Sequence, residues 1–125
     1  MKLPVSTYIS GTIVDVDFPY HDGNEKSKVR PAVVISYDDS VTNVALLQVT
    51  SHTPRTEFDY EISDYEGTGL YKEPSVVRCN CVFSIPNTEM LQKRGVLSRK
   101  DFNSVMILFN DAIIQKKVEY YNNHP

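Results

Sequence analysis

The sequence predicts an α+β protein: a small, strongly curved sheet or half-open barrel of five or more strands, followed by one long helix. Two observations support this prediction. Short apolar segments alternate with polar residues and are separated by clusters rich in Pro, Gly, Asp and Asn, as in strands joined by turns. The last apolar pattern instead has helical spacing. A chain of 125 residues, 41% hydrophobic and 23% charged, fits one domain over residues 1–125.

The first strand is predicted from about Tyr8 to Phe18. Apolar side chains alternate there with Asp15 and Asp17, so one face of this strand is expected to meet solvent. A polar loop with the sequence PYHDGNEKSKV follows. This loop is long for a hairpin connection, and long loops are often functional.

Three further strands are predicted in the middle of the chain. Pro31 is expected to open the second strand, because proline's missing N–H does least harm at a first strand position. A turn cluster over Asp38–Asn43 separates it from a third strand over Val44–Ser51. The fourth strand, Glu57–Ile62, has its apolar side chains on one face and its carboxylates on the other, so it should be exposed on one side. A glycine-containing loop over residues 66–74 follows.

A fifth strand over Ser75–Phe83 contains the unusual stretch SVVRCNC. Strand alternation puts Arg78 and Asn80 on one face and both cysteines on the other, with the apolar set. Buried free cysteine behaves as a small hydrophobe, whereas a disulfide between residues two apart on a strand has poor geometry. A zinc site would need further ligands at suitable spacing, and none is evident. Arg78 by itself fits either a solvent-facing charge or a functional group.

The C-terminal helix is predicted to begin after Ser98 and to extend to about Lys117. Ser98 and Asp101 have the spacing of a capping box, directly before the apolar pattern. The apolar stripe is wide, which suggests that the helix is covered on more than one side, for example by a partner subunit.

Composition narrows the classes of function. The net charge of −3 and the pI near 5.5 argue against strong non-specific DNA binding, although they leave room for a local basic groove. No apolar run approaches the length of a membrane span, and the N-terminal residues do not resemble a signal peptide, so a cytoplasmic protein without membrane contact is expected. Two cysteines do not make a disulfide framework.

An ordered set of motifs, from Gly11 to Ile114, resembles the MazF/PemK family of toxins from bacterial type II toxin–antitoxin pairs. Each motif is weak alone, but their order and spacing together are specific. The motifs are GTIVDVDF from Gly11, G-x-E at Gly23 and Glu25, RPAVVI from Arg30, VTS from Val49, GL from Gly69, SVVR from Ser75, and RG-x-LS from Arg94.

The resemblance implies an SH3-like barrel of about five to seven strands with a C-terminal helix, in a homodimer. It also implies metal-independent, cofactor-free cleavage of single-stranded RNA at short sequences, and a cognate antitoxin as partner. The family's central catalytic arginine and threonine correspond to Arg30 and Thr50. A second arginine, in the PemK/Kid branch, corresponds to Arg78. Ser51 and Lys28 are expected to help bind RNA.

One departure from the family pattern concerns the general base. The branch that carries the second arginine has an aspartate two residues later, and this chain has Asn80 there. An amide cannot accept a proton as a carboxylate does, so Asn80 either only binds RNA or the base lies elsewhere. His21, His52 and Glu25 are the candidates, since histidine suits proton transfer near neutral pH. The sequence shows no partner for either histidine, which favours an ordinary surface residue, and Glu25 also fits a residue that pairs with a lysine or caps the loop.

The chemistry expected from these residues is attack of the RNA 2′-hydroxyl on the adjacent phosphorus. Two arginine forks, Arg30 and Arg78, would bind the phosphate oxygens on which negative charge develops. Two other functions stay open. One is gyrase poisoning on the same barrel, as in CcdB toxins, although the ending VEYYNNHP does not resemble the one expected. The other is a catalytically weak RNA- or protein-binding module, which Asn80 favours.

Overall fold

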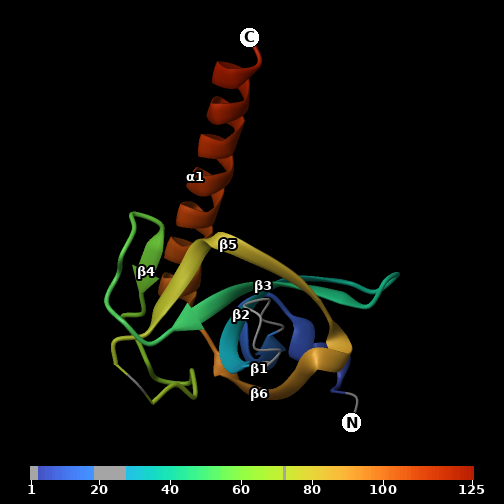
Figure 1. Cartoon of the computed structure of the whole chain (residues 1–125). Helices are drawn as coiled ribbons and strands as arrows, with labels where there is room; N and C mark the ends of the chain where they lie inside the picture. The colour runs from blue at the N-terminus through green and yellow to red at the C-terminus, as the bar shows by residue number, and fades with distance from the viewer. Residues whose placement is uncertain (1–2, 19–27, 72) are drawn as a thin grey trace.

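The computed structural model describes residues 3–18, 28–71 and 73–125. Six strands form one antiparallel sheet, preceded by a short 3-10 helix, η1, and followed by the long helix α1 (Figure 1). A second 3-10 turn, η2, joins the last two strands. The elements are η1 (Val5–Tyr8), β1 (Thr12–Phe18), β2 (Lys28–Asp38), β3 (Asn43–Thr50), β4 (Asp59–Glu61), β5 (Val76–Pro86), η2 (Asn87–Glu89), β6 (Met90–Val96) and α1 (Arg99–Asn123).

The predicted α+β class and the long C-terminal helix are confirmed. The strand order is β4-β5-β3-β2-β1-β6, and every pairing is antiparallel. The sheet curls strongly, but its two ends, β4 and β6, do not pair with each other, so it is half-open and not a closed barrel (Figure 1). The pairing of the strands shifts register at four points. Such irregularities bend strands and increase their twist.

Both faces of this sheet are buried. Alternate residues of the central strands supply two separate apolar clusters, as strand geometry requires. One cluster contains Val14, Val34 and Leu46. The other contains Ile13, Val33 and Leu47, together with Val105 of α1. The core is therefore divided between the concave side of the sheet and the side that α1 covers.

The expectation that β1 has one wet face is wrong. Asp15 is only 3% exposed, because Arg94 and Gln92 of the neighbouring β6 cover it and bind its carboxylate. The first segment also begins with η1 instead of a strand. Pro31 lies inside β2 and not at its start, but the β2–β3 ladder begins one residue later at Ala32↔Gln48. The missing N–H of proline therefore removes no bond from that ladder.

Other strand and helix boundaries differ from the predicted ones where the hydrophobic pattern of the sequence is weak. The fourth strand shrinks to three residues, although Phe58, Tyr60 and Ile62 all pack on the core as their alternation predicts. Strand β6 was not predicted, since MLQKRGV has no alternation of apolar and polar residues. Helix α1 continues six residues beyond Lys117, to Asn123.

Helix α1 begins where the cap was predicted. Ser98 Oγ accepts a hydrogen bond from the N–H of Asp101 at 3.1 Å. The first turns pack on β5 and β4, whereas the C-terminal half projects away from the sheet (Figure 1). Ile113, Ile114 and Val118 are each about half exposed there. Nothing in the described residues covers this stripe, and the expected partner subunit stays a prediction.

Candidate active site

A pocket of about 280 Å³ lies where the start of β2, the end of β3 and one residue of β6 come together. The register explains the meeting point. Ala32 of β2 pairs with Gln48 of β3, so the residues before the former and after the latter emerge at the same end of the sheet. The loop before β5 supplies the opposite wall. The lining residues are Val29, Arg30, Pro31, Val49, Thr50, Ser51, Leu70, Tyr71, Ser75 and Arg94.

Three residues predicted from the sequence meet in this pocket: Arg30, Thr50 and Ser51. Arg30 is half-buried on β2 and pairs with Val16 of β1. Thr50 is the last residue of β3 and is half-buried, and Ser51 follows it on the exposed rim. A guanidinium and two hydroxyl groups in a small concave site form a donor set that suits a phosphate group.

His52 lies directly behind Thr50. The threonine Oγ1 is 2.7 Å from His52 Nε2, and the other ring nitrogen, Nδ1, is 2.7 Å from the carbonyl oxygen of Thr53. Of the three candidate bases, His52 therefore contacts a predicted catalytic residue. His21 and Glu25 lie outside the described residues.

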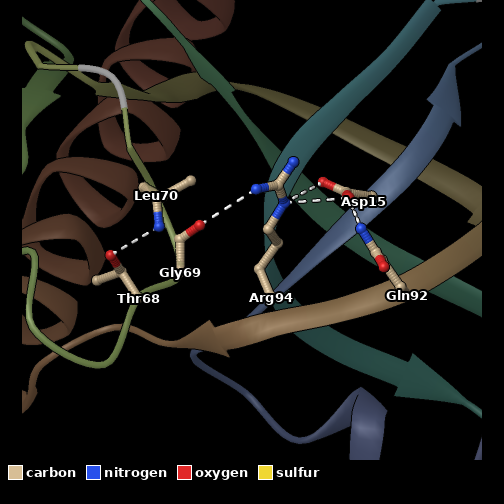
Figure 2. A network of polar contacts seen from close by, with 6 residues as sticks. All are labelled: Asp15, Thr68, Gly69, Leu70, Gln92 and Arg94. Atoms are coloured by element: carbon tan, nitrogen blue, oxygen red, sulfur yellow. Dashed lines mark hydrogen bonds and ion pairs between the residues drawn. The ribbon is translucent and has the colours of Figure 1, made fainter.

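Arg94 is a second arginine of the pocket, although its motif was not predicted to contribute to the site (Figure 2). Its Nε donates to both carboxylate oxygens of Asp15, at 2.9 and 3.0 Å, and its Nη1 donates to the carbonyl of Gly69 at 3.2 Å. Gln92 holds the same carboxylate from the other side, with Nε2 2.6 Å from Oδ2. These contacts fix the guanidinium while its side chain stays 31% exposed. The RG motif that begins at Arg94 was the available signal.

The loop opposite Arg94 is held close by glycine. Gly69 has a φ of +71°, and a Cβ atom there would lie 2.3 Å from the backbone oxygen of Arg94. Thr68 Oγ1 accepts the N–H of Leu70 at 3.2 Å, which fixes the loop from within (Figure 2). Tyr71 follows and is 87% exposed, with its ring 5.8 Å from Cζ of Arg94. An exposed aromatic ring therefore stands beside the cationic pocket.

Arg78 and Asn80 do not line this pocket. Arg78 is half-buried on β5, opposite Asp59 of β4. Asn80 is exposed and lines a shallow groove of about 220 Å³ between β5 and α1, with Phe109 and Lys116 among its neighbours. Lys28 is exposed at the start of β2. The arginine that shares the pocket with Arg30 is therefore Arg94.

Of the two cysteines of SVVRCNC, Cys79 belongs to the packing, and neither lines the pocket. Cys79 is buried in the apolar cluster beneath α1, and Cys81 is half-buried. Burial, together with the nearby carboxylate of Asp59, raises the pKa of the Cys79 thiol to about 12. The thiolate is therefore not available near neutral pH. Among the described residues, no three His, Cys, Asp or Glu side chains are grouped as metal ligands would be.

Most of the chain matches one known protein family. Residues 9–112 match the model of the PemK-like, MazF-like toxins of type II toxin–antitoxin systems. The chain belongs to the PemK/MazF toxin family. The matched range includes Arg30, Thr50 and Arg94, so the pocket lies entirely within the family's domain. No curated protein sequence matches the chain.

Solved structures of PemK/MazF toxins share the fold at low sequence identity. One is an endoribonuclease in complex with its cognate antitoxin from a mycobacterial species, with TM-score 0.66 and 12% identity over 84% of this chain and 93% of that chain. Another is the Mycobacterium tuberculosis toxin MazF-mt6, with TM-score 0.63 and 20% identity over 82% and 95%. A third is MazF of a Deinococcus radiodurans MazE–MazF crystal, with TM-score 0.67 and 18% identity over 83% and 93%.

Within residues 3–18, 28–71 and 73–125, no helix combines the length and the apolar character needed to cross a membrane.

Proposed function

We propose that this toxin is a sequence-specific endoribonuclease that cleaves single-stranded RNA by attack of a 2′-hydroxyl on the adjacent phosphorus, without a metal ion. The observation that carries the proposal is the meeting of Arg30, Thr50 and Arg94 in one pocket. Family membership and the naming of two mycobacterial structural neighbours as endoribonucleases support the endoribonuclease activity.

The pocket offers what such a reaction needs at phosphorus. Negative charge develops on the non-bridging oxygens as the 2′-oxygen attacks, and preorganised cations stabilise it. Arg94 is held by Asp15 before substrate arrives, which removes part of the cost of ordering a long side chain. Ser51 adds a hydroxyl donor on the rim. The requirement for a 2′-hydroxyl selects RNA over DNA.

Bases flanking the scissile phosphate would be held outside the pocket. Tyr71 presents an exposed ring next to Arg94, and single-stranded bases stack on such rings. Lys28 and Arg78 lie outside the pocket and would contact the RNA backbone on either side. Asn80 would act as a binding residue only. The active form is proposed to be a cytoplasmic homodimer whose antitoxin covers the RNA-binding surface.

The test is cleavage of a sequence-diverse single-stranded RNA pool in EDTA, followed by mapping of the ends. The expected products carry a 2′,3′-cyclic phosphate and a 5′-hydroxyl. Arg30→Ala should lower the rate about 100-fold or more while the fold is retained. Lys100→Ala, an exposed change on α1 at a residue that does not line the pocket, serves as the matched control. Bound but intact RNA after long incubation would indicate a binding module instead.

A further inference from the structure

The short chain of contacts behind the pocket, Thr50–His52–Thr53, determines how the histidine ring is protonated. The Thr53 carbonyl oxygen can only accept a hydrogen bond, so Nδ1 of His52, 2.7 Å away, must carry the proton. In the neutral ring, Nε2 then has a lone pair. Thr50 Oγ1, 2.7 Å from Nε2, is therefore the donor in that contact.

This arrangement has the form of an activated hydroxyl. A base lies within hydrogen-bond reach of a hydroxyl, and a third group orients the base. The hydroxyl belongs to Thr50, which lines the pocket, whereas the ring lies behind it and does not line the pocket. The oxygen of Thr50 can thus accept a proton from the pocket side while its own proton passes to Nε2 of His52.

Among the described residues, His52 is the titratable side chain with a recorded hydrogen-bond contact to Thr50. Arg30 and Arg94 border the pocket with Thr50 and have no lone pair available. The Asp15 carboxylate is held by Arg94 and Gln92. On the segment after His52, Arg55 and Glu57 are exposed. Asn80 faces the groove beside α1 and cannot accept the proton.

We propose that His52 is the proton acceptor of this site and acts through the hydroxyl of Thr50. The inference rests on the proposed function. It places the general base at the end of β3, on His52. The strand of Arg78 carries only the amide of Asn80 where the related branch has an aspartate. His52 does not touch RNA in this scheme, so it is a positioning and relay residue.

The step balances in atoms and protons. The 2′-hydroxyl gives its proton to Thr50 Oγ1 as the 2′-oxygen forms its bond to phosphorus. Thr50 gives its own proton to His52 Nε2. The bond from phosphorus to the 5′-oxygen breaks, and that oxygen takes a proton from water. The imidazolium of His52 then returns its extra proton to solvent.

The decisive experiment compares His52→Gln and His52→Asn over a range of pH on a cleavable RNA. The Gln amide oxygen can accept the Thr50 hydrogen bond but not the proton, whereas Asn keeps only the contact with Thr53. For the unmodified protein, kcat/KM should fall about tenfold per pH unit on the acid side of its pH profile, because a protonated Nε2 of His52 cannot accept the Thr50 proton. We call this fall the acid limb. Both variants should be about 100-fold slower, retain RNA affinity and lose this acid limb.

Two comparisons complete the test. His124→Gln, at the exposed C-terminal end, should retain both the rate and the acid limb. If His52→Gln keeps the rate and the limb, His52 only orients Thr50 and the proposal is overturned. If His21→Gln removes the limb instead, the proposal is equally overturned. An unmodified protein that cleaves no RNA would contradict the proposed function itself, which separates the two failures.

Discussion

Arg94 and Asp15 form a fixed ion pair, with Nε 2.9 Å from Oδ1, between adjacent strands at the edge of the pocket. The carboxylate is buried, with its side chain 4% exposed, and the guanidinium is not. The pair therefore connects the stability of the sheet to the charge of the site.

Arg94→Ala should impair both stability and cleavage. It leaves the Asp15 carboxylate buried without its cation, which should cost about 2 kcal/mol of unfolding free energy, less than for a fully buried pair because Arg94 is partly exposed. Cleavage should fall about 100-fold. Adding Asp15→Asn should restore part of the stability but none of the activity. Urea unfolding and RNA cleavage measure the two effects, and the exposed neighbour Lys93→Ala should change neither.

Gly69→Ala should destabilise the pocket loop more than Gly67→Ala. Both glycines have positive φ, +71° and +76°, so both substitutions carry the left-handed backbone cost of about 1 kcal/mol. Only at Gly69 would the new Cβ meet backbone, 2.3 Å from the oxygen of Arg94, against 4.0 Å from Val96 for Gly67. We expect losses of about 3 and about 1 kcal/mol in urea unfolding. Equal losses would show that the close approach is unimportant.

Asp101→Asn should remove an acid-sensitive part of the stability. Burial would raise the pKa of Asp101, but hydrogen bonds from Ser63, Tyr60 and the Asp64 N–H together lower it. A lowered pKa in the folded state adds stability above the ordinary aspartate pKa of about 4, and this stability is lost as the pH falls through the folded value. The gap between the two proteins in unfolding free energy should therefore be largest near pH 7 and shrink below pH 4. Asp111→Asn, exposed on the same helix, should show no such gap.

Asn80→Asp should leave the rate of RNA cleavage within about twofold of the unmodified protein. Asn80 lies in the groove between β5 and α1, outside the pocket that holds Arg30 and Thr50. A carboxylate there would be placed away from the proposed site of proton transfer. A clear rise in kcat would show instead that the strand of Arg78 carries the base. Initial rates at saturating RNA, with Asn80→Ala as a second variant, make this measurement.

Local patterns were enough to predict the α+β class, most of the strands, the helix start at Ser98 and the placing of Arg30 and Thr50 in one candidate site. These features depend on local alternation, on capping or on ordered motifs, which can be read along the chain. The resemblance to the toxin family, confirmed by the match over residues 9–112, rested on the same local order.

Other features depend on contacts between segments that are distant in the sequence, and no local pattern predicts them. Asp15 alternates as a solvent-facing residue would, yet it is buried because Arg94, 79 positions away, binds it. Strand β6 has no pattern of its own and is ordered by pairing with β1. Arg94 thereby joins Arg30 in the pocket, whereas Arg78 lies outside it. An ion pair offsets the cost of burying a carboxylate, and strand pairing orders a segment that has no alternation of its own. Neither effect leaves a periodic signal in the sequence.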